Sequence, residues 1–232
     1  YGSSSISPTV LAASRKLFKA DFYQWYGQTE TGMNSVLRPE DHAKRSHYTG
    51  REMFNAEIRI VDENGRETPR GEVGEIISAQ KPLGMIGYNN LAEKTRDTIR
   101  NGWIYTGDLA RVEADGYFTV VDRIRDMIIS GAENIYPKEI ENAVSSHAEV
   151  QEVAVIGIPD DVYGESVCAI VVPRPGSELD EQTIINHCAK QLARYKKPKK
   201  VIFMDALPKN AAGKVTKNVL RSPFWDDREK QV

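Results

Sequence analysis

The sequence lacks the features that mark several large classes of protein. Its 232 residues include only two cysteines, Cys168 and Cys188, so it offers no disulfide framework and no cysteine-based metal site. No apolar run approaches the roughly 20 residues of a membrane-spanning helix. The 31 Lys and Arg are balanced by 33 Asp and Glu, which argues against a dedicated nucleic-acid-binding surface. The first residues show neither the basic nor the apolar segment of a secretory signal, and we expect a cytoplasmic, reducing location.

The composition that is present is typical of a folded globular protein with room for one large or two modest domains. Hydrophobic residues make up 40% of the chain and charged residues 28%. Up to about residue 123, short β-type runs are joined by turn signals such as Asn64-Gly65 and Asp115-Gly116. After Arg125, strand patterns alternate with helix patterns, which predicts a small α+β domain. The predicted fold class is therefore mixed α/β and α+β, with a β-rich part followed by a small α+β domain.

The individual elements are predicted from apolar periodicity and from turn residues. Cys168 lies in an apolar strand pattern and is expected to be a reduced core residue. Helices are expected over residues 8–19, 138–146, 181–193 and a short stretch ending at 221; strands over 22–26, 57–61, 74–78, 117–121, 127–129, 153–158, 167–172 and 200–204; and loops over 131–134 and 207–214.

The segment Tyr26–Glu30 combines a strand end, a glycine, and a hydroxyl next to a carboxylate. Backbone amides and the Thr29 hydroxyl are suited to a phosphate oxygen. Glu30 is suited to Mg²⁺, which prefers one or two carboxylates together with phosphates. The alternative interpretation is an exposed polar turn.

Two further segments carry residues of chemical interest. Asp108 is expected in a tight turn after an aromatic strand, and Arg123 follows about one hairpin later. An Asp and an Arg held in this way suit two neighbouring hydroxyls, such as those of a ribose, although each is also common as an ordinary turn or surface residue. Lys214 follows Gly213 in a loop, where it is either a solvated side chain or a point charge for a developing oxyanion.

Taken in order, these segments resemble the adenylate-forming superfamily. The matching motifs are Tyr26–Glu30, Gly71–Glu75, Tyr105–Leu109, Asp122–Glu141 and Pro208–Arg221. That superfamily includes acyl- and aryl-CoA synthetases, adenylation domains of peptide synthetases, and beetle luciferases. The residues from Arg221 onward look most like those of bacterial acyl-CoA synthetases, so the resemblance is to the C-terminal portion of such a ligase.

The resemblance implies a division of the chain and a role for each motif residue. Residues 1–123 would be the C-terminal part of the large AMP-binding domain, and residues 124–232 its mobile C-terminal domain. The implied roles are Thr29 at the α-phosphate, Glu30 on Mg²⁺, Tyr26, Gly27 and Gln28 lining the adenine and acyl pocket, Asp108 with Arg123 on the ribose, Arg125 as hinge, Lys214 in adenylation, and Gly131 with Ala132 at the CoA channel. Two positions depart from the usual pattern, since Ala132 replaces a second glycine and Arg125 replaces Asp or Lys.

The implied activity is that of an ATP-dependent acyl-CoA synthetase, which converts a carboxylic acid to acyl-AMP, releases pyrophosphate and transfers the acyl group to CoA. The family's phosphate loop, rich in Ser, Thr and Gly and ending in Pro-Lys, has no match in this sequence, and the chain does not begin with Met. We therefore expect a fragment that is inactive without the missing N-terminal part of the large domain and that exposes apolar surface for self-association. The alternatives are an enzyme that loads a carrier protein and a stand-alone, non-catalytic binding module.

Overall fold

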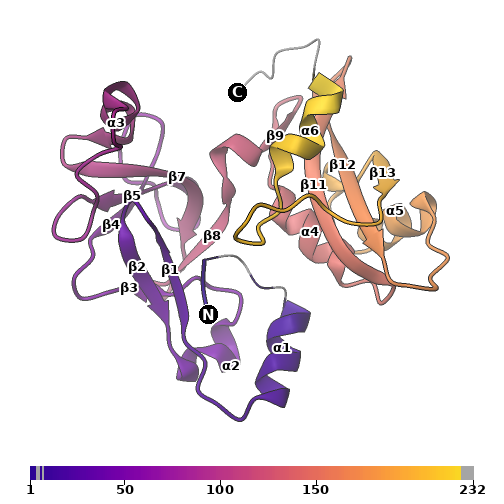
Figure 1. Ribbon diagram of the computed structural model, residues 1–232, viewed down its shortest axis with the longest axis horizontal. Helices are drawn as coiled ribbons and strands as arrows, with labels where there is room; N and C mark the ends of the chain where they lie inside the picture. Colours follow the sequence, from indigo (N-terminus) through magenta and orange to yellow (C-terminus); the bar gives the residue numbers. More distant parts are fainter. Residues whose placement is uncertain (4–5, 7, 226–232) are drawn as a thin grey trace. The chain divides into compact units, whose positions relative to one another are not determined.

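The computed structural model describes residues 1–3, 6 and 8–225, so part of the C-terminal stretch compared above lies outside the described residues. The chain forms two compact units, Tyr1–Ile124 and Arg125–Val232 (Figure 1). The division predicted between residues 123 and 124 lies one residue before this boundary.

The first unit contains two antiparallel sheets and short helices. Its smaller sheet has the order β1-β2-β3, and its larger sheet has the order β4-β5-β7-β6, with β8 paired to β7. The elements are α1 (Pro8–Leu17), β1 (Gln24–Gln28), β2 (Gly32–Leu37), η1 (Pro39–Asp41), α2 (His42–Arg45), β3 (Arg51–Glu52), β4 (Ile58–Val61), β5 (Val73–Ala79), α3 (Ala92–Thr98), β6 (Ile99–Arg100), β7 (Trp103–Val112) and β8 (Phe118–Arg123).

The core of the larger sheet follows the two-residue alternation of its strands. Ile60, Ile76, Ala110 and Phe118 come from four different strands and form one buried cluster. Tyr26 of β1 packs against this cluster from the smaller sheet. Burial of this apolar set therefore fixes β1 beside the larger sheet.

Several element predictions for the first unit were wrong at their ends, such as the first helix, which ends at Leu17 and not at 19. Two of the differences concern predicted site residues. The first strand was expected over residues 22–26, but β1 begins at Gln24 and continues through Gln28, because Gly27 and Gln28 are paired with β2. Asp108 was expected in a turn, but it lies within β7, paired with Arg123 of β8. A register shift in the β5–β7 pairing, between Glu75 and Ile77, accommodates the irregular backbone before Asp108.

The second unit is a five-stranded sheet covered by helices on both faces (Figure 1). The order is β10-β9-β12-β11, and β13 pairs in parallel with β12. Its elements are η2 (Ile124–Asp126, which crosses the boundary), β9 (Ile128–Ser130), β10 (Glu133–Ile135), α4 (Pro137–Ser145), β11 (Val150–Asp160), β12 (Gly164–Pro173), α5 (Glu181–Ala189), η3 (Arg194–Lys196), β13 (Lys200–Phe203) and α6 (Lys217–Trp225).

The two faces of this sheet are sorted by alternation along β11 and β12. Val155 contributes to the cluster shared with Ile140 of α4 and Ile184 of α5. Its neighbour Ile156 contributes to the opposite cluster, shared with Leu220 of α6. Helices therefore pack on both faces because β11 and β12 are apolar on both sides, as strands buried on both faces require.

The element predictions for the second unit were right in kind and wrong at several ends. Helix α5 ends at Ala189 and not at 193, whereas α6 continues past Arg221 to Trp225. The expected loop at 131–134 is mostly a tight hairpin, because Glu133 already pairs with Ser130. The predicted mixed α/β and α+β fold class is confirmed, and so is the buried, free thiol of Cys168.

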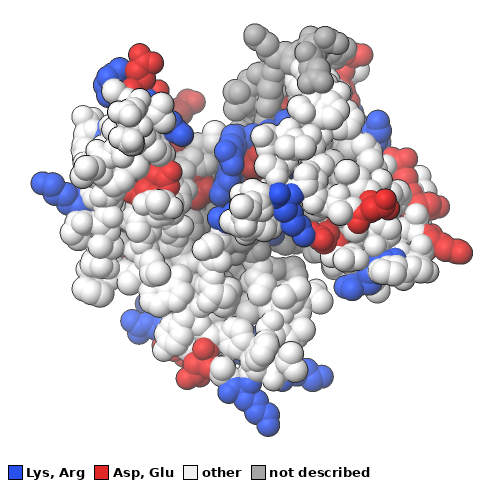
Figure 2. Space-filling view, in the orientation of Figure 1, with Lys and Arg blue, Asp and Glu red and all other residues white. Residues whose placement is uncertain are grey.

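Charged side chains of both signs occur on the face drawn in Figure 2. Several form ion pairs within one unit, for example Arg45 with Asp115 at 2.7 Å in the first unit. Among the described residues, none of the helices is both long and apolar enough to cross a membrane.

Candidate functional site

The hairpin between β1 and β2 requires a glycine at position 27. A Cβ atom at Gly27 would lie 2.0 Å from the carbonyl oxygen of Gly32, a distance that no side chain tolerates. This close approach turns the chain tightly, so that Thr29 and Glu30 occupy the turn, with Thr29 exposed to solvent.

Buried polar side chains hold this turn from beneath. The Thr31 hydroxyl accepts hydrogen bonds from the Gln28 amide at 3.2 Å and from Asn34 Nδ2 at 3.0 Å. The Asn34 side-chain oxygen Oδ1 in turn accepts from the Ser78 hydroxyl of β5 at 2.9 Å. Thr31, Asn34 and Ser78 are all at most 2% exposed, so the bonds compensate for their burial and make the turn a rigid platform.

Asp108 is the centre of a buried polar cluster in the first unit. Its Oδ2 accepts hydrogen bonds from the Tyr26 hydroxyl at 2.9 Å and from Gln28 Nε2 at 2.8 Å. Its Oδ1 lies 3.4 Å from Nε of Arg123, whose side chain is 44% exposed. Only 6% of Asp108 is exposed, and the three donors compensate the cost of burying its charge.

The backbone before Asp108 is fixed by two further side chains. Gly107 has a φ of +71°, a left-handed conformation that favours glycine, and its amide donates to the Glu75 carboxylate at 2.9 Å. The Thr106 hydroxyl accepts from the Asp108 amide at 3.1 Å and donates to the Ile76 carbonyl at 2.7 Å. Asp108 is thus positioned by its own strand as well as by its partners.

Burial also sets the proton affinity of groups around Asp108. Desolvation, followed by the neighbouring Asp108 charge, raises the pKa of Tyr26 well above its usual value. The phenol therefore stays protonated and remains a donor to the carboxylate. Desolvation likewise raises the pKa of Glu75.

Glu30 is held by the loop that follows β5. The Tyr88 hydroxyl donates to Glu30 Oε1 at 2.9 Å, and the Met85 amide donates to the Glu30 carbonyl at 2.7 Å. The tyrosine binds one carboxylate oxygen, and none of the residues that the structure describes donates a hydrogen bond to Oε2. No group of three or more His, Cys, Asp or Glu residues that suits a metal was found among the described residues. A single carboxylate still fits Mg²⁺, because the phosphates of a nucleotide supply further oxygen ligands.

The loop that carries Lys214 is organised by Asn210. The Asn210 side-chain oxygen accepts from the amides of Ala212 at 3.0 Å and Lys214 at 2.9 Å. The Asn210 backbone amide also donates to the Lys214 carbonyl at 2.9 Å. Lys209 and Val215 form an isolated antiparallel β-bridge that closes the loop. The lysine therefore projects from a closed, hydrogen-bonded turn and not from a loose loop. Among the described residues, no carboxylate forms an ion pair with the Lys214 ammonium.

The remaining predicted residues lie at the start of the second unit. Arg125 is the first residue of that unit and lies exposed in η2. Gly131 and Ala132 form the exposed two-residue turn between β9 and β10. The Gly131 amide donates to the carbonyl of Tyr163 at 2.7 Å, which ties this turn to the end of β11 and the start of β12.

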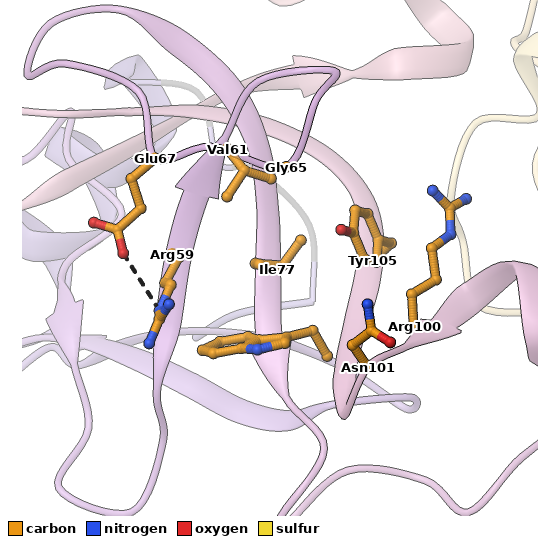
Figure 3. A pocket seen from close by; sticks show the side chains of 9 residues that line it. Arg59, Val61, Gly65, Glu67, Ile77, Arg100, Asn101 and Tyr105 are labelled. Carbon is orange, nitrogen blue, oxygen red and sulfur yellow. Dashed lines mark ion pairs between the residues drawn. The ribbon is translucent and has the colours of Figure 1, made fainter.

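A separate pocket of about 500 Å³ lies on the other face of the larger sheet (Figure 3). Arg59 covers the ring of Trp103 and pairs with Glu67, while Arg100 lies over Tyr105. Of the described residues that line it, none is a predicted site residue. Ile77 and Tyr105 line this pocket. Asp108 instead contacts Tyr26, which packs against the core cluster that contains Ile76.

The structure thus brings Tyr26, Gln28, Asp108 and Arg123 together, and it places Thr29 and Glu30 in the adjacent turn. Sequence reasoning did not find the side chains that support this arrangement. In the first unit they are Thr31, Asn34, Glu75, Ser78 and Tyr88. In the second unit, Asn210 supports the separate loop of Lys214. For Asn210 a signal was available, since an Asn before a Gly-Lys turn is typical of a side chain that bonds backbone amides two to four residues on.

Two protein-family models match separate parts of the chain. The model described as "AMP-binding enzyme" matches residues 1–89. The model described as "AMP-binding enzyme C-terminal domain" matches residues 139–214.

Curated proteins and solved structures give the same result. A medium/long-chain-fatty-acid–CoA ligase of Mycobacterium tuberculosis is 39% identical over 241 residues, covering 100% of this chain and 42% of the relative. A fatty acid–[acyl-carrier-protein] ligase of Streptomyces coeruleorubidus is 38% identical over 240 residues, covering 100% of this chain and 45% of the relative. The crystal structure of ATP-bound MatB from Rhodopseudomonas palustris superposes with a TM-score of 0.89 at 36% identity, covering 98% of this chain and 45% of that one.

The chain spans less than half the length of these relatives. Within that span the likeness extends over both units. The chain belongs to the adenylate-forming superfamily of AMP-binding enzymes, as a portion homologous to its acyl-CoA ligases.

Proposed function

We propose that the chain is part of an ATP-dependent acid–thiol ligase that makes an acyl adenylate and then an acyl-CoA. The observation that carries the proposal is the Asp108 cluster, a buried carboxylate with an adjacent arginine. The polypeptide that contains this chain would supply the phosphate loop and most of the carboxylic-acid pocket.

In this proposal Asp108 binds the two ribose hydroxyls of the nucleotide. Its Oδ2 already accepts from Tyr26 and Gln28, whereas Oδ1 has a single long contact with Arg123. A carboxylate oxygen accepts about two hydrogen bonds, so Oδ1 keeps capacity for hydroxyl donors. Arg123 assists at the ribose, and Tyr26, Gly27 and Gln28 line the space for the adenine and the acyl group.

The turn between β1 and β2 would face the triphosphate. Thr29 is exposed there and would donate its hydroxyl to the α-phosphate. Glu30 would hold Mg²⁺ through Oε2, while Tyr88 fixes its other oxygen. When bound, Mg²⁺ would offset negative charge on the phosphates.

Lys214 would serve the first half-reaction. A carboxylate oxygen attacks the α-phosphorus, the bond to pyrophosphate breaks, and an acyl adenylate forms. Because both reactants are anionic, a cation placed beside the developing charge lowers the barrier. In the second half-reaction the CoA thiol, as thiolate, attacks the acyl carbon and AMP leaves with the bonding electron pair.

Arg125 would be the hinge about which the second unit rotates between the two half-reactions. Gly131 and Ala132 would line the path of the CoA pantetheine arm. What supports this role is position: Arg125 lies at the boundary of the two units, and the 131–132 turn is exposed. Further partners would be the N-terminal part of the large domain and, through exposed apolar side chains, a second copy of the chain. Cytoplasmic location stays a prediction from the composition.

A second candidate acceptor is a carrier protein. The Streptomyces relative named as a fatty acid–[acyl-carrier-protein] ligase favours this alternative. Both acceptors carry the same phosphopantetheine thiol. They differ because only a carrier protein would need a docking surface on the enzyme. Supplying the longer enzyme with CoA and with a pantetheinylated carrier protein in parallel would separate them.

The test of the proposed function is acid-dependent exchange of pyrophosphate into ATP by the longer enzyme. We expect Lys214→Ala and Asp108→Asn each to lower exchange by about 100-fold or more, the range found when one charge-stabilising group is removed. Lys190→Ala, at an exposed lysine of the same unit, is the matched control and should leave exchange unchanged. Full exchange in the Lys214 variant would overturn the catalytic role, and acyl-CoA formation by residues 1–232 alone would overturn the dependence on further chain.

A further inference from the structure

We propose that Glu75 is a positioning residue for the nucleotide site, which strengthens the preference for a ribose by fixing the backbone that carries Asp108. The proposal rests on the proposed function, in which Asp108 binds the two ribose hydroxyls. The Glu75 carboxylate accepts a hydrogen bond at 2.9 Å from the amide of Gly107, the residue directly before Asp108. Glu75 would therefore act on a bound nucleotide through the backbone and not by touching it.

The backbone that Glu75 holds is a bulge in β7. The pairing of β5 with β7 joins Ile77 to Tyr105 and then Glu75 to Leu109. One residue of β5, Ile76, thus lies opposite three residues of β7, which are Thr106, Gly107 and Asp108. A bulge interrupts the regular ladder of backbone hydrogen bonds, so its conformation depends on the other groups that bind its amides and carbonyls.

Side chains from both strands bind the backbone at this bulge. The Thr106 hydroxyl accepts from the Asp108 amide at 3.1 Å and donates to the Ile76 carbonyl at 2.7 Å. The Gly107 amide is bound by Glu75 instead. Because glycine is the most flexible residue, Gly107, with its left-handed φ of +71°, is the part of the bulge that gains most from an anchor. Fixing Gly107 fixes the point from which the Asp108 side chain starts.

Glu75 and the carboxylate of Asp108 lie on opposite faces of the sheet. Asp108 accepts from the hydroxyl of Tyr26, whose ring packs against the buried cluster that contains Ile76. Successive side chains of a strand point to opposite faces, so Glu75 shares the face of Ile77, which lines the pocket in Figure 3. Glu75 therefore supports Asp108 from behind and leaves the side that faces β1 to the nucleotide.

The surroundings of Glu75 show that its carboxylate is not an ordinary solvated group. The side chain is half-buried, and desolvation raises its pKa, whereas the Gly107 amide and the charge of Arg100 lower it. The nearby charge of Asp108 also raises the pKa. Two carboxylates placed close together are unfavourable unless hydrogen bonds compensate each of them. The bond to Gly107 is charge-assisted, and such bonds are stronger than those to a neutral acceptor.

The first test measures the preference for a ribose in the longer enzyme, as the ratio of kcat/KM for ATP to kcat/KM for 2′-deoxy-ATP in the complete ligation. A site built to bind a hydroxyl rejects an analogue that lacks it. We expect Glu75→Ala to lower this ratio by about tenfold, because a loosened Asp108 gains less from the hydroxyl. Glu75→Gln, which keeps an acceptor oxygen without the charge, should lower the ratio less.

The matched control is Glu72→Ala, at an exposed glutamate of the same unit, and it should leave the ratio unchanged. If Glu75 only contributed to folding, its loss would lower both kcat/KM values alike. An unchanged ratio in the Glu75→Ala variant would therefore overturn the proposal, and so would an equal change in the Glu72→Ala variant.

The second test needs no catalysis and follows amide hydrogen exchange in the 232-residue chain. We expect Glu75→Ala to accelerate exchange at Gly107 and Asp108 by at least about tenfold relative to residues 109–112 of the same strand. Uniform acceleration along β7, or none at Gly107, would overturn the proposal. An unmodified enzyme that uses ATP and 2′-deoxy-ATP equally well would refute the ribose role of Asp108, whereas exchange at Gly107 would still decide whether Glu75 holds the bulge.

Discussion

Replacement of Tyr26 by Phe tests whether the Asp108 cluster is held together as the structure indicates. The change removes the 2.9 Å hydrogen bond to Asp108 Oδ2 and keeps the ring that packs against Phe118. A hydrogen bond to a charged group contributes about 1.5–3 kcal/mol. Since Gln28 and Arg123 still contact the carboxylate, we expect a loss near the lower end, about 1.5 kcal/mol.

The assay is urea unfolding of the first unit, followed by tryptophan fluorescence. Trp25 and Trp103 lie in this unit and Trp225 in the other, so a Trp225→Phe background isolates the signal. With a slope of about 1.5 kcal/mol per molar urea for a unit of this size, the midpoint should fall by about 1 M. Tyr23→Phe is the matched control, at a tyrosine of the same unit that is 45% exposed.

Two results would refute this reasoning. A midpoint that moves by less than about 0.3 M would show that the phenol contributes no net stability to the cluster. Equal losses in the Tyr26 and Tyr23 variants would show that the effect is not specific to Asp108. If the proposed function holds, the KM for ATP in the longer enzyme should also rise, by up to about tenfold for the same free energy.

Three further predictions concern the turn, the core and the pH dependence. Gly27→Ala places a Cβ against the Gly32 carbonyl and should destabilise the first unit by about 2 kcal/mol or more in the same urea assay; a wild-type midpoint would contradict the required glycine. Burial raises the pKa of the Cys168 thiol to about 11, so Ellman's reagent at pH 8 should label it only after unfolding, and rapid labelling of the native chain would disprove the burial. Lys199, with two backbone amides, lowers the pKa of Asp160 to about 2, so the stability it contributes is present above pH 4 and lost as pH falls from about 4 to 2. Asp160→Asn should therefore flatten acid unfolding over that window, and an unchanged pH profile would exclude the pair as its cause.

Local signals in the sequence predicted most of the elements but not all of their ends. The turn at Asp62–Gly65 was predicted, and the Asp62 side chain does accept from the amides of Asn64 and Arg66, a purely local device. The strand expected at 153–158 extends over 150–160, because its ends are set by pairing with β12 and not by its own composition. Helix α6 continues through Pro223, which local propensity disfavours and which packing of Phe224 and Trp225 against the sheet supports.

The sequence motifs named candidate residues, but they did not predict how those residues are arranged. Each motif marked a residue type at a position, but the contact between Tyr26 and Asp108 spans 82 residues and that between Glu30 and Tyr88 spans 58. Contacts of this range depend on how the two sheets pack, and no single segment encodes them. The same limit explains why Asp108 was expected in a turn: Thr106-Gly107-Asp108 has turn composition, but pairing with β8 keeps it in a strand.

Each of the two groups of predicted site residues is held together by hydrogen bonds within one unit. The Asp108 cluster, with Glu30 and Tyr88, is built only from residues before the boundary, and the Lys214 turn is closed by Asn210 after it. A change of torsion at residues 124–125 therefore breaks none of the hydrogen bonds that shape either group. If the proposed function holds, Lys214 is able to move between the two half-reactions while the hydrogen bonds of the Asp108 cluster stay in place.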